Sequence, residues 1–288
     1  MALRRKARSA EVDLDSLVVS GDQGAYEALQ LFKSRAMRFK TKDDNIMNAI
    51  NVAIHGAKAL LSKGYVNAGA ELANLVIDFI NEAGMEINPQ MRTLLFEVDS
   101  EFPPASPFRI EFLKACVKST IANGQREMGD PVVHLRLANC LWEIKDKNAI
   151  YHFVLSEEPE VLSQKIDAMY GRADQIVERD RKFTLAILHF LALENLRDAH
   201  ELFRFFKKSQ KVRKLPTDSE LVTFCDYLVQ LSRRDAAPLF KTLVNKYADA
   251  LNFDETAPTL VMGPIAQRLF NIQPKANPVM SMLQNLLT

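Results

Sequence analysis

Residues 24–42 of the chain read GAYEALQLFKSRAMRFKTK, and their apolar side chains recur at every third or fourth position. That period places Tyr26, Leu29, Phe32 and Ala36 on one face of a helix, with Leu31 beside them. The next segment repeats the spacing at Ile46, Ala49, Ile50, Ala53, Ala57, Leu60 and Leu61. Only 10 glycines occur, and β-branched residues form no alternating runs. The sequence therefore predicts an all-α fold.

The composition excludes several classes of function. The chain has 288 residues with 37 basic and 36 acidic side chains, a formal charge of +1, so bulk charge selects neither a nucleic acid nor a membrane. With 48% hydrophobic and 25% charged residues, it is typical of a soluble folded protein. No apolar run reaches about 18 residues, and no apolar core follows the first basic residues. We therefore expect no membrane span, no signal peptide and a cytosolic location.

A weak internal repeat indicates how the helices are organised. Amphipathic segments of roughly 12–18 residues alternate with short breaks such as KTKDD (40–44), FPPASP (102–107) and NGQREMGDP (123–131). A turn followed by an alanine-centred helix recurs around Ala28, Ala70, Ala149 and Ala199. These alanines would let neighbouring helices approach closely. The uneven spacing favours a degenerate α-solenoid of antiparallel helix pairs, similar to a tetratricopeptide array, in a single elongated domain.

Motifs for catalysis, metal binding or cofactor binding are absent from the sequence. None of the 5 histidines belongs to an HExxH motif or pairs with cysteine at zinc spacing, and no phosphate-binding or nucleophile-elbow motif occurs. We interpret His55 as a core or surface histidine. Cys116, Cys140 and Cys225 lie among apolar residues, which predicts buried reduced thiols. The sequence predicts no enzyme, no cofactor and no metal.

Charge is segregated locally although it is balanced overall. Five basic residues and no acid lie between Lys33 and Lys42, and four more basic residues lie in the first eight positions. Residues 71–101 contain seven acidic residues and one basic residue, Arg92. Residues 204–214 contain six basic residues. Each run is either a solvated face or a docking surface. The 204–214 run fits a solvated loop, a ligand for an acidic protein or a weak RNA contact.

Several segments, in order, resemble the Golgi-to-ER traffic protein 4 family, the scaffold subunit of the tail-anchored-protein targeting complex. Near the start they are GAYEALQLFKSRAMRF and HGAKALLSKGYVNAGAELANLVIDFINEAGMEI. GDPVVHLRLANCLWEIKDKNAIYHFVLS follows in the middle, and RLFNIQPKANPVMSMLQNLLT ends the chain. The succession covers almost the whole sequence, and no single motif in it is specific.

This resemblance implies an α-solenoid adaptor without enzymatic activity. Family members join a ubiquitin-like-domain protein to the homodimeric ATPase that carries tail-anchored proteins to the endoplasmic reticulum membrane. A tetratricopeptide co-chaperone reaches the complex through the ubiquitin-like protein. By this resemblance residues 1–150 would bind the ATPase and residues 151–288 the ubiquitin-like protein, with no nucleic acid and no direct membrane insertion.

The resemblance also assigns roles to residues in the first half. The family's basic anchor for the ATPase corresponds in region to Arg35, Arg38, Lys40 and Lys42, although one of its basic positions falls on Thr41. Two acids that regulate the ATPase match Glu71 and Asp78, one heptad apart. Glu71 stands where the family has aspartate, so the charge is kept on a longer side chain.

In the second half, we expect helices around residues 181–270 to form an apolar groove for the ubiquitin-like partner. The candidate lining residues are Phe203, Phe206, Phe224, Tyr227 and Phe240. For any single one of them, the favoured interpretation is solenoid core. The terminal MSMLQNLL would either cap the core or contact a partner.

Two other classes of protein remain open at this point. A scaffold subunit of another helical-repeat assembly would share the fold. It would lack an acid pair like Glu71 and Asp78 next to a basic first helix. An RNA-binding helical repeat would use the 204–214 run, and its RNA binding would persist at physiological salt.

Overall fold

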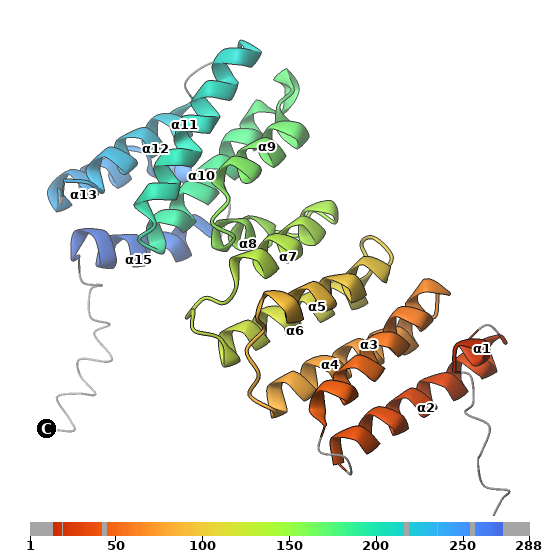
Figure 1. Ribbon diagram of the computed structural model, residues 1–288. Coiled ribbons are helices and arrows are strands. Elements are labelled where there is room, and N and C mark those ends of the chain that lie inside the picture. The colour runs from red at the N-terminus through yellow and green to blue at the C-terminus, as the bar shows by residue number, and fades with distance from the viewer. Residues whose placement is uncertain are drawn as a thin grey trace, which may run out of the picture. The chain divides into compact units, whose positions relative to one another are not determined.

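The computed structural model describes residues 14–18, 20–41, 45–215, 219–234, 236–253 and 257–272. Fifteen α-helices, one 3-10 turn and no strand occur within these ranges, so the all-α prediction is confirmed. By internal contacts the chain divides into two compact units, Met1–Ala149 and Ile150–Thr288, called unit 1 and unit 2 below. Each unit is a stack of packed helices (Figure 1).

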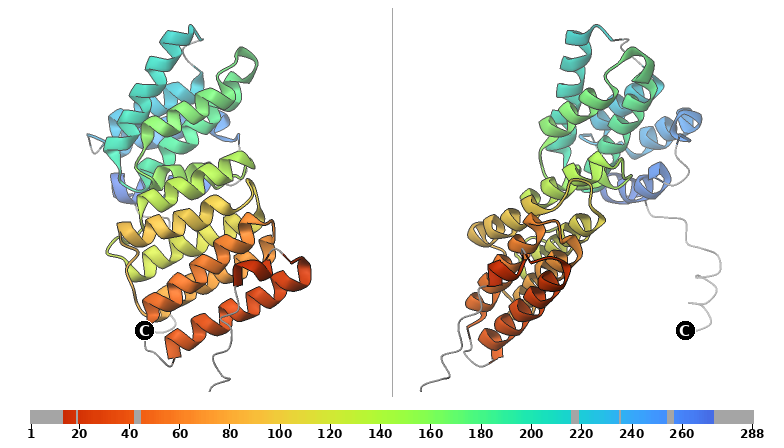
Figure 2. Two further views of the ribbon diagram at one scale, coloured as in Figure 1. Left: turned by 45° about the vertical axis from the view of Figure 1, so that its right-hand side comes forward. Right: turned by 90° about the vertical axis from the view of Figure 1, so that its right-hand side faces the viewer.

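Unit 1 is a stack of helix pairs in two layers, seen from two sides in Figure 2. Its helices are α1 (Leu14–Val18), α2 (Asp22–Thr41), α3 (Ile46–Ser62), α4 (Val66–Glu82), α5 (Pro89–Glu101), α6 (Pro107–Asn123) and α7 (Pro131–Glu143). One layer holds α2, α4 and α6, each packed on the next, and the other holds α3 and α5. Across the layers, α3 packs against α2 and α4, and α5 packs against α6, as in an α-solenoid.

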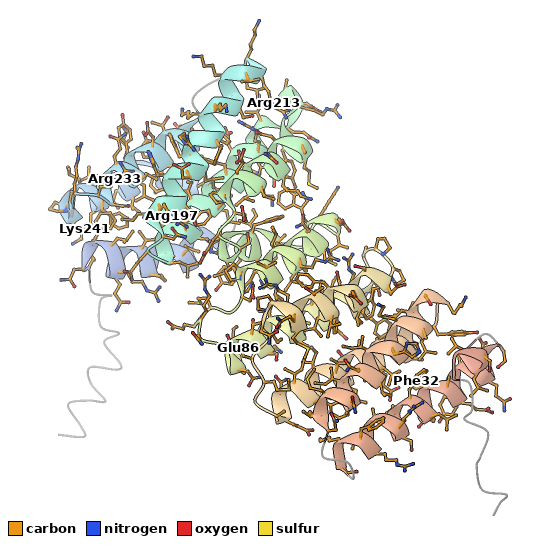
Figure 3. All side chains as sticks on the ribbon, viewed as in Figure 1. Phe32, Glu86, Arg197, Arg213, Arg233 and Lys241 are labelled. Atoms are coloured by element: carbon orange, nitrogen blue, oxygen red, sulfur yellow. The ribbon has the colours of Figure 1, made fainter. Side chains whose placement is uncertain are left out.

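Small residues allow the first three long helices of unit 1 to pack closely. A Cβ on Gly56 of α3 would lie 2.6 Å from the Phe32 ring and 2.7 Å from a methyl carbon of Leu72. Phe32 of α2, labelled in Figure 3, is 1% exposed in this contact. Ala28 and Ala70, two of the repeated alanines, are also buried. The alanine-centred pattern therefore marks the interfaces between helices.

Most predicted breaks coincide with helix ends for identifiable chemical reasons. Asn88 and Asp130 cap α5 and α7, their side-chain oxygens accepting from backbone amides two or three residues on, and a proline follows each cap. The sequence also indicates a break at GDQG (21–24), and this break is shorter than expected. Gly21 has φ +99° in the turn, whereas Gly24 is buried inside α2.

Unit 2 is built around α10 (Ile176–Ala192), which packs against α9, α11, α12 and α15. The surrounding elements are α8 (Ala149–Leu155), α9 (Pro159–Tyr170), η1 (Ala173–Gln175), α11 (Leu196–Arg213), α12 (Glu220–Leu231), α13 (Ala237–Lys246), α14 (Ala248–Leu251) and α15 (Ala257–Phe270). The sequence allows a solvated loop at 204–214 and a linker as far as 219, and this is wrong for most of that length, because residues 204–213 continue α11. Pro216 lies outside the described residues.

Aromatic pairs fill the core of unit 2. The Phe206 ring stacks on Phe183 with 3.9 Å between centroids, and Phe240 stacks on Phe270 at 4.3 Å. The guanidinium of Arg179 is fully buried over the Phe206 ring, and its Nε donates to Asp167 at 2.8 Å. This ion pair joins α10 to α9 inside the unit.

The three cysteines are buried and free, as predicted. Burial raises the pKa of the Cys116 thiol and raises that of Cys225 to about 12, so both stay protonated at neutral pH. The Cys225 thiol donates to the Thr184 hydroxyl at 3.5 Å. Within the described residues, no helix has the length and hydropathy needed to cross a membrane.

Candidate partner-binding surfaces

Ion pairs join helices that are two apart along the chain of unit 1, at nearly constant sequence separation. They are Lys33–Glu71, Lys40–Glu82, Lys58–Glu97, Arg92–Asp130 and Arg136–Asp99. The partners are 37 to 42 residues apart, which is the length of one helix-pair repeat. Asp99 is fully buried and also accepts two hydrogen bonds from Arg109, at 2.8 and 3.0 Å. Much of the predicted charge segregation therefore holds the stack together.

The basic residues of α2 divide between two sides of the helix. Lys33 and Lys40 are two turns apart and both pair with α4; Lys40 also lies 5.2 Å from the centroid of the Phe79 ring. At about 100° per residue, Arg35 and Arg38 project from the opposite side of α2. Both arginines are exposed. The predicted anchor is therefore not one continuous surface, and Lys42 lies outside the described residues.

Glu71 and Asp78 lie on one side of α4, two turns apart and exposed. Glu71 is paired with Lys33. Asp78 makes no ion pair with a side chain in the described part of the chain. It lies between Glu71 and Glu82 on the same side of α4. Lys33 and Lys40 of α2 pair with those two acids, so Asp78 is the acid on this side that α2 leaves available to a partner.

The five predicted groove residues differ in their access to solvent. Phe206, Phe224 and Phe240 are at most 4% exposed and pack within unit 2. Phe203 is half-buried, with the Lys207 ammonium 5.5 Å from its ring centroid. Tyr227 on α12 is 48% exposed. The surface available to a partner in this arrangement is therefore that of Tyr227 and Phe203, and the groove itself stays a prediction.

Sequence reasoning missed the exposed Leu239 on α13, which is 57% exposed and follows Tyr227 in the adjacent helix. Figure 3 labels Arg233 and Lys241 in the α12–α13 region. On α2 it also missed that Leu31 and Met37 are about 40% exposed. A helical wheel of each segment could have placed these residues off the buried face.

The histidines and carboxylates of the described ranges form no candidate metal site. These ranges contain no group of three histidine, cysteine or carboxylate side chains that could hold a metal. His134 is buried, where its Nε2–H donates to the Met128 carbonyl at 2.7 Å, and burial lowers its pKa. His55 packs edge-on against the Phe32 ring. A cavity of about 440 Å³ between α5, α6 and α7 contains the Arg92–Asp130 ion pair.

Stacked helix pairs, joined by regularly spaced side-chain contacts, define a helical-repeat protein of the α-solenoid class. The family model of Golgi to ER traffic protein 4 matches residues 43–287. The chain therefore belongs to the Golgi to ER traffic protein 4 family, as its sequence indicated. Membership assigns it a role in the tail-anchored protein targeting and Golgi-to-ER traffic pathway, within a protein complex of that pathway.

The relatives match over nearly the full chain. The chain is 26% identical to "Protein GET4" of Arabidopsis thaliana, with 99% of this chain and 97% of the relative covered. It is 27% identical to "Golgi to ER traffic protein 4 homolog" of Homo sapiens, with 99% and 87% covered. The "Crystal structure of C. therm. Get4" superposes with a TM-score of 0.77 at 25% identity, covering 96% of this chain and 93% of that one.

Proposed function

We propose that this protein is a non-enzymatic cytosolic adaptor that bridges a ubiquitin-like-domain protein, with its co-chaperone, to the homodimeric targeting ATPase. In this role it promotes handover of tail-anchored clients for insertion into the endoplasmic reticulum membrane. Membership of the Golgi to ER traffic protein 4 family over residues 43–287 is the observation that carries the proposal. The helical-repeat fold supports it, because stacked helices offer extended surfaces for other proteins.

The ATPase would contact unit 1 at two separate surfaces. Arg35 and Arg38, exposed on the side of α2 away from Lys33, would hold an acidic face of the ATPase. Asp78 and Glu71 on α4 would engage a basic element and regulate nucleotide hydrolysis. The division of α2 into two charged sides supports separate roles, since holding and regulation would use different side chains.

The ubiquitin-like partner would contact unit 2. Tyr227 and Phe203 are the predicted groove residues with accessible surface, and Leu239 adds exposed apolar area on the neighbouring helix. Phe206, Phe224 and Phe240 would support these residues from the core. An apolar segment of the partner would then bury Tyr227 and Leu239.

A pull-down from native cytosol tests both contacts on the full chain. The double variant Arg35→Glu/Arg38→Glu should lose the ATPase and keep the ubiquitin-like protein. Tyr227→Ala/Leu239→Ala should show the reverse. The control, Lys114→Glu/Lys118→Glu on exposed positions of α6, should keep both. If the unaltered chain captures neither partner and instead another assembly, the adaptor proposal is wrong.

A further inference from the structure

The exposed face of α11 carries a stripe of basic side chains. Arg197, His200, Arg204, Lys208 and Lys211 recur at three and four residues, within an arc of about 80° at 100° per residue. All five are exposed, and the buried face of α11 lies opposite them at Ala199, Leu202, Phe206 and Gln210. Figure 3 shows Arg197 and Arg213 at the two ends of this helix.

The positive charge is not balanced evenly along the stripe. Near the start of α11, Arg197 pairs with Asp198 at 2.8 Å, and Arg204 pairs with Glu201. No acid occurs between Glu201 and Asp218 in the sequence. Lys208, Lys211 and Lys214 are exposed and form no ion pair with any described side chain. The unbalanced charge is therefore concentrated in the last two turns, here called the α11 basic end (Lys208, Lys211, Arg213 and Lys214).

The position of the α11 basic end is fixed by packing. A Cβ on Gly171, at the end of α9, would lie 2.5 Å from Nη1 of Arg213, so the two helix ends are in contact. Lys214 adopts the left-handed conformation that ends α11, with φ 53°, and its amide donates to the carbonyls of Gln210 and Lys211. The cations are therefore held on an ordered helix end, which lowers the entropy cost of binding an anionic ligand.

The surroundings favour an acidic peptide over a nucleic acid or a membrane. Arg204 lies 4.9 Å from the Phe205 ring centroid and Lys207 5.5 Å from that of Phe203, so a cation competes with a base for stacking on each ring. Val212, 73% exposed, is the large apolar residue that projects here, which is too little apolar surface to anchor in a bilayer. From Arg204 to Lys214 the helix rises about 15 Å, the span of about five extended residues.

We infer that the α11 basic end binds a partner segment rich in aspartate and glutamate. This inference goes beyond the proposed function. The site belongs to unit 2, and it uses neither Arg35 and Arg38 of unit 1 nor the predicted groove residues.

Fluorescence anisotropy of a labelled ten-residue oligoglutamate with the full chain tests the inference. Binding should saturate and weaken as salt rises. Lys208→Glu/Lys211→Glu should weaken it about tenfold or more, since two attractive charges become repulsive. The control Lys114→Glu/Lys118→Glu makes the same charge change at exposed sites four residues apart on α6 and should leave binding unchanged. Thermal unfolding of both variants checks that each is folded.

Three results would overturn the inference. The first is an equal loss in both double variants, which would make the binding a bulk charge effect. The second is tighter binding of a ten-nucleotide single-stranded RNA that Lys208→Glu/Lys211→Glu abolishes, which would assign the surface to nucleic acid. The third is an absence of saturable peptide binding, including a case in which the chain instead associates with vesicles containing anionic lipid.

Discussion

Lys33 on α2 and Glu71 on α4 form an ion pair between neighbouring helices of one layer of unit 1, although 38 residues separate them in the sequence. Glu71 is also the residue for which the family resemblance predicts a regulatory contact with the ATPase. A partner that engages Glu71 must therefore compete with Lys33. Both side chains are about a third to a half exposed, so solvent screens the ion pair. Breaking it should therefore cost a free energy of up to about 1 kcal/mol.

A charge swap separates the structural role of Glu71 from its predicted role in regulation. Lys33→Glu or Glu71→Lys alone should lower the free energy of unfolding by about 1 kcal/mol, because like charges then face each other. The double swap Lys33→Glu/Glu71→Lys should restore most of it. ATPase turnover in the complex should nevertheless stay altered, because position 71 is still basic. If the double swap also restores turnover, Glu71 acts only within the chain.

Asp99 should be far more important for stability than the exposed acids near it. It is fully buried and accepts hydrogen bonds from Arg109 and Arg136, so Asp99→Ala leaves both guanidinium groups without their carboxylate. We expect a loss of about 3 kcal/mol in urea unfolding followed by circular dichroism. Glu97→Ala, which breaks the half-exposed pair with Lys58, is the matched control and should cost less than about 1 kcal/mol. Equal losses would contradict the prediction.

Gly56 should not tolerate alanine. At Gly56 the new methyl group would overlap the Phe32 and Leu72 side chains, so Gly56→Ala should cost about 1–3 kcal/mol. Thermal unfolding of the variant measures the loss, and a stabilising Gly56→Ala would show that the helices can separate there.

His189 should make the protein less stable in acid. Burial lowers the pKa of this histidine on α10 to about 4 from an ordinary 6.5, and its ring packs edge-on against Tyr151. The unfolded chain therefore binds the proton first as the pH falls. The contribution is fully present above pH 6.5 and is lost between pH 6.5 and about 4, by up to about 3 kcal/mol.

The variant His189→Gln should flatten that part of the stability profile, measured by urea unfolding between pH 4 and 8. His134, whose pKa is also lowered by burial, should keep a residual slope of the same sign in the variant. His200→Gln, at an exposed position, serves as the control and should leave the profile unchanged. If the free energy of unfolding of His189→Gln depends on pH as strongly as that of the unaltered chain, protonation of His189 is not the cause of the loss of stability in acid.

The sequence was sufficient to predict the helices and much of their packing. A helix that buries one face has apolar residues at every third or fourth position, as around Phe32 and the repeated alanines. This pattern can be recognised within a single segment of sequence. Caps at Asn88 and Asp130 are equally local. Local patterns therefore predicted the fold class and most helix ends.

The charge pairing could not be predicted in the same way. Whether Lys33 faces solvent or Glu71 depends on how far α4 is shifted along α2, which is set by side chains that the two helices contribute together. The groove prediction met the same difficulty. Phe206 and Tyr227 are both aromatic residues on amphipathic helices, yet one stacks on Phe183 and the other is exposed. Only the packing of neighbouring helices distinguishes them.

The short span of the contacts in unit 1 has a consequence for synthesis of the chain. Its described ion pairs join residues at most 42 positions apart, so each is complete as soon as the following helix pair exists. The first helices can therefore pair on the ribosome while the later helices are still being translated, because these ion pairs use no residue of the second half. Slow codons placed after α4 would give Lys33 and Glu71 time to meet before α10 is made.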